Sequence, residues 1–90
     1  MYTMDFQWDE KKSEANKLKH GIDFKTAKEL WNDKDRIEIQ TNFPGENRTA
    51  LIGKIGDKLW AAIFTRRGHT IRIISVRRAR KKEAILYEHK

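Results

Sequence analysis

The residues best suited to chemistry form a basic run near the end of the chain, residues 71–82. Arg72 stands there between Ile71 and Ile73. Further cations follow at Arg77, Arg78, Arg80, Lys81 and Lys82. Alternation of isoleucine with arginine is typical of a strand with one buried and one exposed face. Because the arginine fork matches phosphate oxygens and stays charged, the run predicts a phosphate-contacting surface. Arg72 could equally be a solvated cation on an exposed face, or a partner for Glu38 on another strand.

A carboxylate and a histidine outside this run could take part in proton transfer. Glu46 lies beside Arg48 at the boundary between an expected loop and an expected strand. A carboxylate in that setting could be a general base, although it is more often half of a surface ion pair. His20 lies near the expected end of a helix, where a cation is favoured, so it suits either a capping role or acid–base chemistry.

The positive charge of the chain lies almost entirely in its second half. Residues 1–45 hold eight Lys or Arg against nine Asp or Glu, whereas residues 46–90 hold twelve against four. The halves therefore carry net charges of −1 and +8, which add to the formal net charge of +7. Such an asymmetry indicates a polyanionic partner.

Several classes of protein are not expected. The chain has no cysteine, and its three histidines, His20, His69 and His89, are scattered, so we expect neither a metal site nor a cofactor. The first residues lack a basic segment followed by an apolar run, and no apolar stretch is long enough to span a bilayer. An intracellular protein fits this pattern.

The first half predicts a short strand and two helices. Met4, Phe6 and Trp8 alternate with polar residues as in a strand. Asp9 can cap a helix that ends near His20, before Gly21, with Trp8, Ala15, Leu18 and Ile22 as its buried stripe. Asp23 can cap a second helix, in which Phe24, Ala27, Leu30 and Trp31 recur at helical spacing.

A basic side of the first helix borders the expected buried stripe. Lys12, Asn16 and Lys19 recur there at helical spacing, close to Trp8. These side chains either line a groove or form a solvated helix face.

The period then changes from helical to alternating. Residues 36–40, 48–55, 59–65 and 70–76 read as strands joined by short turns, which makes them antiparallel. Residues 79–89 read as a closing basic helix. The sequence therefore predicts one α+β domain over residues 1–90: two N-terminal helices, an antiparallel sheet of about four strands with a possible short N-terminal strand, and a C-terminal helix.

These elements carry motifs of a known family. The chain resembles the BrnT toxins of bacterial type II toxin–antitoxin modules. The matching segments are residues 6–12 with Asn16 and 19–24, then 45–48 with 52–53, then 64–68, 71–79, Glu83 and Tyr87. Phe64 and Val76 depart mildly from the family pattern, and the loop before Glu46 is shorter than in many relatives.

The resemblance implies a RelE-like fold and a ribonuclease that arrests translation. It also implies a partner, a BrnA-like antitoxin with a ribbon-helix-helix DNA-binding domain. Two toxins are then expected to join one antitoxin dimer. The assembled complex is expected to bind operator DNA through the antitoxin alone.

We expect RNA cleavage without a metal ion, by attack of the RNA 2′-hydroxyl on the adjacent phosphorus. Arg72 and Arg77 are the candidates for stabilising the phosphorane, with help from Arg48. Glu46 is the candidate base, and His20 or Lys12 could be acid or base. The candidates for RNA binding are Lys19, Arg78, Arg80, Lys81 and Lys82.

Two alternatives from other classes explain the charge equally well. The chain could be a nucleic-acid-binding regulator without catalysis. It could also be a small interaction module whose basic face docks an acidic antitoxin. Incubation with labelled RNA in EDTA separates cleavage from retention.

Overall fold

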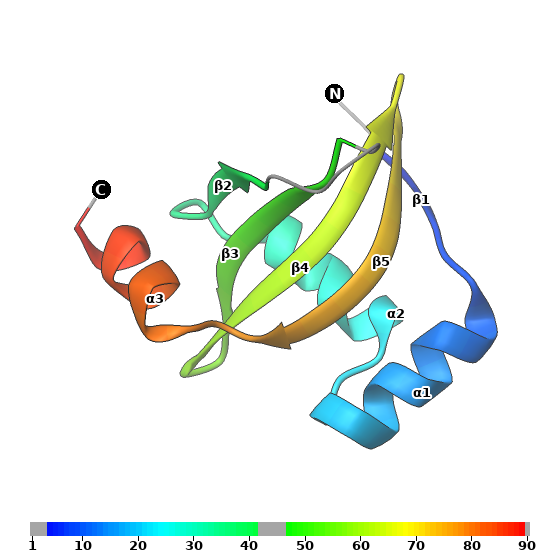
Figure 1. The fold of residues 1–90 in the computed structure, drawn as a ribbon, viewed down its shortest axis with the longest axis horizontal. Coiled ribbons are helices and arrows are strands. Elements are labelled where there is room, and N and C mark those ends of the chain that lie inside the picture. The colour runs from blue at the N-terminus through cyan, green and yellow to red at the C-terminus, as the bar shows by residue number, and fades with distance from the viewer. Residues whose placement is uncertain (1–3, 42–46, 90) are drawn as a thin grey trace.

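A mixed sheet forms the body of the protein. The computed structural model describes residues 4–41 and 47–89. Its strands are β1 Asp5–Gln7, β2 Ile37–Gln40, β3 Thr49–Ile55, β4 Lys58–Arg67 and β5 Thr70–Arg78. They lie in the order β1-β5-β4-β3-β2 (Figure 1), with β2 to β5 antiparallel and β1 parallel to β5. The four predicted antiparallel strands and the possible N-terminal strand are therefore confirmed. The sheet is nevertheless mixed and not antiparallel throughout, because alternation reveals a strand but not its direction.

The helices begin and end largely where their caps predict. Helix α1 spans Glu10–His20, and the Asp9 carboxylate accepts hydrogen bonds from the backbone N–H groups of Lys11 and Lys12. Gly21 ends it in the left-handed conformation, with φ of 82°. Helix α2 spans Phe24–Ala27 and is capped by Asp23, as predicted.

Other boundaries differ from the prediction. The second helix is not continuous, because after α2 it tightens into a 3₁₀ helix, η1, Lys28–Asn32. Strand β5 runs two residues past the predicted end, so the last helix, α3, spans only Lys81–Glu88. The boundary moved because Arg77 and Arg78 still pair with β4.

The two faces of the sheet are covered differently. On the helical face, Leu51, Phe64, Ile73 and Val76 pack with Phe24, Leu30 and Trp31 in the main core. Figure 1 shows α2 and η1 lying across this face. The opposite face, called the open face below, is covered near one end by α3, where Tyr87 and Ala79 pack on Ala50, Ile52 and Ala61.

Of the predicted buried stripe, Ile22 is buried and Trp8 packs on the core, but helix α1 itself buries polar side chains in place of Ala15 and Leu18. Leu18 is 90% exposed and Ala15 is exposed, whereas Ser13 and Asn16 are buried. The Ser13 hydroxyl accepts a hydrogen bond from the Phe24 N–H at 2.9 Å, which joins α1 to α2. The helical wheel failed because polar contacts, rather than apolar burial, hold this helix.

Asn16 closes the outer edge of β5. Strand β1 pairs with β5 only from Thr70 to Arg72, so other groups must satisfy the backbone of Val76. The Asn16 amide donates to the Val76 carbonyl at 2.9 Å and accepts from the Val76 N–H at 3.1 Å. It also donates to the Ile22 carbonyl at 2.8 Å. One side chain thus replaces a neighbouring strand, so Asn16 does not line a groove.

Replacing Asn16 should destabilise the protein. Asn16→Ala leaves buried backbone groups of Val76 and Ile22 unpaired, and each such group costs about 1–3 kcal/mol. We expect the free energy of unfolding, measured by urea titration, to fall by about 2–4 kcal/mol. Lys19→Ala, on the exposed side of the same helix, is the matched control and should change stability by less than about 0.5 kcal/mol. Equal losses in the two variants would contradict the role of Asn16.

Candidate functional site

A row of polar side chains crosses the open face. Arg72 on β5 lies opposite Thr65 on β4 and opposite Gln7 on β1. Thr49 pairs with Phe64, so the same register continued by one residue brings Arg48 beside Thr65. Since neighbouring strands are about 4.8 Å apart, the backbones at Arg48 and Arg72 are about 10 Å apart. The row therefore brings together two of the predicted catalytic arginines.

A β-bulge places Arg77 on the same face as Arg72. Residues an odd number apart point to opposite faces of a regular strand. In β5, however, Ile73 pairs with Phe64 and Ser75 with Ile63, which leaves Ile74 as an extra residue. The shift brings Arg77 beside Ala61 on the open face.

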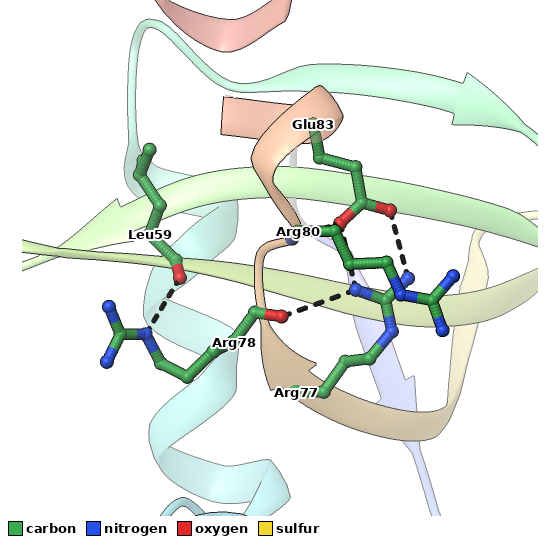
Figure 2. Close-up of polar contacts among 5 residues, drawn as sticks. All are labelled: Leu59, Arg77, Arg78, Arg80 and Glu83. Carbon is green, nitrogen blue, oxygen red and sulfur yellow. Dashed lines mark hydrogen bonds and ion pairs between the residues drawn. The ribbon is translucent and has the colours of Figure 1, made fainter. Parts of the chain in front are cut away.

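Arg77 forms a two-pronged ion pair with Glu83 of α3. Its guanidinium donates to the two Glu83 oxygens at 2.8 Å and 2.9 Å (Figure 2). The Glu83 carboxylate also accepts from the Arg80 N–H at 2.7 Å, which caps α3. These hydrogen bonds, led by that from Arg77, hold the pKa of Glu83 below its usual value, and the bond with Glu83 raises the pKa of Arg77. The geometry makes Arg77 an anchor for α3.

The remaining cations of the basic run point in different directions. Figure 2 shows the guanidinium of Arg78 directed away from those of Arg77 and Arg80. Arg78 donates to the Leu59 carbonyl at 3.3 Å and lies over the Trp60 ring at 5.4 Å, on the helical side. Arg80, Lys81 and Lys82 are exposed where α3 begins. The predicted RNA-binding residues are thus divided between the two faces.

A second polar contact fastens the other end of α3. The Tyr87 hydroxyl donates to Asp33 Oδ2 at 2.7 Å, and the same oxygen accepts from the Lys54 N–H at 2.8 Å. Burial and then the Asp33 carboxylate raise the pKa of Tyr87 to about 12. No α3 residue within the described range is fully buried, and Ile85 and Leu86 are about half exposed. The Arg77–Glu83 ion pair, the Tyr87–Asp33 hydrogen bond and a small apolar contact therefore hold α3 on the sheet.

The predicted site residues on α1 lie apart from the row. Lys12 and Lys19 are exposed and His20 is partly exposed, on a helix that packs along the β5 edge. Glu46 lies outside the described residues. The suggested pairing of Arg72 with Glu38 was wrong: Glu38 faces the helical side, opposite Leu51, and pairs with Arg66 at 3.0 Å.

A cavity missed by sequence reasoning opens on the helical side. It has a volume of about 230 Å³ and is lined by Met4, Trp31, Arg36, Glu38, Arg66, Gly68, His69 and Ile71. These residues come from distant segments, so only the strand register could have revealed their proximity.

Neither a metal-binding cluster nor a membrane-spanning helix is found in the described part of the chain. Within residues 4–41 and 47–89, no three His, Asp or Glu side chains gather closely enough to hold a metal ion. None of the helices in this part is long and apolar enough to cross a membrane.

Comparison with known proteins identifies one family. The model of a family described as "Ribonuclease toxin, BrnT, of type II toxin-antitoxin system" matches residues 8–83. A search among curated proteins gave no match. The matched segment includes α1, every strand from β2 to β5, and Glu83.

Acid should loosen α3 through Glu83. A carboxylate whose pKa is lowered by folding stabilises the native state above its unfolded pKa, and this contribution is lost as the pH falls through the folded value. Between about pH 5 and pH 3, near and below the ordinary value of 4.5, the protection factors of the α3 amides, relative to the exchange rate of an unfolded chain at the same pH, should therefore fall.

Glu83→Gln should remove this acid-dependent step. Glu88→Gln, at the exposed end of the same helix, should keep it. An unchanged step in Glu83→Gln would mean that another group controls the docking of α3.

Proposed function

The chain belongs to the BrnT family of ribonuclease toxins from type II toxin–antitoxin systems, and on that premise we propose that it cleaves RNA on the open face without a metal ion. The observation that carries this proposal is the row of Arg48, Thr65, Arg72 and Gln7. By strand register, an arginine stands on either side of Thr65 there, and two arginines at such spacing suit a phosphate group. A RelE-like toxin domain over residues 1–90 is part of the same proposal.

In the proposed reaction, the RNA 2′-hydroxyl attacks the adjacent phosphorus and the 5′-oxygen leaves. Arg72 and Arg48 stabilise the negative charge that develops on the phosphorane oxygens. Arg72 is exposed, whereas Glu38 and Glu83 pair with Arg66 and Arg77. A phosphate can therefore approach Arg72 without breaking an ion pair.

The proton-transfer roles are assigned to three residues outside the row. Glu46, two residues before Arg48 in the sequence, is the proposed base. His20 and Lys12 on α1 are the proposed alternatives for acid or base, because α1 packs beside β5.

Binding of RNA outside the row is assigned to the exposed cations. Arg80, Lys81 and Lys82 lie where β5 passes into α3, and Lys19 is exposed on α1. Such contacts with phosphate groups position the substrate without reading its sequence. Arg78 belongs to this group from the opposite side of the sheet.

The resting toxin is proposed to be held by a BrnA-like ribbon-helix-helix antitoxin. A free ribonuclease with a net charge of +7 endangers its own cell, and an acidic antitoxin segment would meet the cationic row directly. The exposed Ile85 and Leu86 offer apolar area nearby. Two toxins would join one antitoxin dimer, which binds operator DNA.

Removal of Arg72 should abolish most of the activity. Loss of one preorganised donor costs about 2–4 kcal/mol of transition-state stabilisation, so Arg72→Ala should slow single-turnover RNA cleavage in EDTA by roughly 30- to 1000-fold. Lys25→Ala, an exposed change on α2, is the control and should cleave at the wild-type rate. RNA retained without cleavage by the wild-type protein would instead indicate a binding module.

The same assay separates two roles of Arg77. If Arg77 acts by anchoring α3, Arg77→Ala and Glu83→Gln should slow cleavage equally, because each breaks the same ion pair. A much larger loss in Arg77→Ala would place its guanidinium at the phosphorane.

The complex with the antitoxin provides a further test. Co-purified toxin and antitoxin should have the mass of two toxins and two antitoxins, and RNA cleavage should be suppressed by at least about tenfold. Arg72→Glu should weaken the complex through charge repulsion, whereas Lys25→Glu should leave it intact. A complex that cleaves RNA as fast as free toxin would show that the antitoxin binds elsewhere.

A further inference from the structure

The cavity on the helical side combines an aromatic wall with charged groups of both signs. Trp31 packs edge-to-face against Phe6 and Phe64, with distances between ring centroids of 5.1 Å and 5.2 Å, and these contacts fix the orientation of its ring. Arg66 lies over the Phe64 ring at 5.3 Å and pairs with Glu38 at 3.0 Å. Arg36 and His69 complete the polar lining. The cavity therefore offers a flat surface, a carboxylate and several donors within about 230 Å³.

One donor in this wall lacks an acceptor. Trp31 is 5% exposed, and its Nε1 has no hydrogen-bond partner within the described part of the chain. A buried N–H group without a partner is costly. Because this nitrogen is shielded from solvent beside the cavity, its resonance reports on a ligand there without touching it.

The donors and acceptors of the cavity match one nucleobase best. Guanine presents two adjacent donors, N1–H and the N2 amino group, which fit the two oxygens of a carboxylate. Its O6 and N7 acceptors fit a guanidinium or an indole N–H. Adenine, cytosine and uracil each place an acceptor beside their donor, so a carboxylate would meet a lone pair. RNA-binding proteins commonly hold an unstacked base against aromatic rings or the plane of an arginine.

We propose that this cavity binds a guanine base of the RNA substrate, with Glu38 accepting from its N1–H and N2 amino groups. Arg66 provides the stacking plane, and Arg36 donates to O6. The Glu38–Arg66 pair has side chains 39% and 49% exposed, so it is weak and can rearrange around the base. The identity of the base as part of a substrate rests on the proposed function.

The cavity lies directly behind the cationic row. Ile71 lines the cavity and Arg72 points to the open face, while Arg66 lines the cavity and Thr65 belongs to the row. Gly68 and His69, in the β4–β5 hairpin, form part of the cavity wall. An RNA strand that passes around this hairpin can place a base in the cavity and a neighbouring phosphate beside Arg72.

Titration of the full chain with single nucleotides tests the base preference without requiring cleavage. GMP should shift the Trp31 indole N–H resonance, assigned with Trp31→Phe, and bind about tenfold more tightly than AMP, CMP or UMP. Glu38→Gln should reduce the affinity for GMP to that for AMP. Glu29→Gln, which removes an equal charge from exposed η1, should change nothing.

Mapping of cut sites in a mixed RNA then connects the cavity with the reaction. Wild-type protein should cut next to guanine, and Glu38→Gln should lose this preference, whereas Glu29→Gln should keep both the rate and the preference. Equal affinities for GMP and AMP would overturn the guanine site. So would a Trp31 indole resonance that shifts when antitoxin is added but not when GMP is added. GMP binding by a protein that cleaves no RNA would uphold the site and reject the proposed ribonuclease reaction.

Discussion

The outer edge of β5 is the constraint on which the rest of the structure depends. This strand carries Arg72 and Arg77, yet β1 covers only its first three residues, Thr70 to Arg72. Beyond them, the amide of Asn16 takes the place of a neighbouring strand at Val76. The same amide holds the carbonyl of Ile22, just before α2. One buried side chain thereby fixes α1, the turn into α2 and the strand that bears the cationic row.

The bulge at Ile74 decides which arginines share a face. A regular strand would direct Arg72 and Arg77 to opposite sides, but the extra residue brings both to the open face. Glu83 then binds Arg77, and Glu38 binds Arg66 on the helical side. Arg66 and Arg77, two arginines near Arg72 in the sequence, are thus paired with carboxylates. The neighbours of Arg72 in the row, Thr65 and Gln7, are uncharged. Arg72 is therefore exposed on the open face without a carboxylate opposite it on β4 or β1.

Sequence reasoning succeeded where the determinants are local. Asp9, Gly21 and Asp23 define helix ends through contacts within a few residues, and alternation identified each strand. Sequence reasoning failed where burial, register or a pairing partner is determined by residues far away in the sequence. Asn16 is buried because of Val76, 60 residues away, which a helical wheel cannot represent. The bulge, the partner of Arg77 and the cavity likewise depend on strand register. The candidate residues were therefore predictable as types, but their division between two faces was not.

That division gives the small sheet two separate surfaces through a single pair of strands. In β4 and β5, successive side chains point alternately to the cavity and to the row. Arg66 and Ile71 line the cavity, whereas their sequence neighbours Thr65 and Arg72 belong to the row. A domain of 90 residues has little interior in which to bury a conventional active-site cleft. The row on the open face and the cavity on the helical face are both built from β4 and β5, strands that the core already requires. Because β4 and β5 are rigid neighbours, the two surfaces hold a fixed separation, and that separation sets which phosphate meets Arg72 once a base is bound.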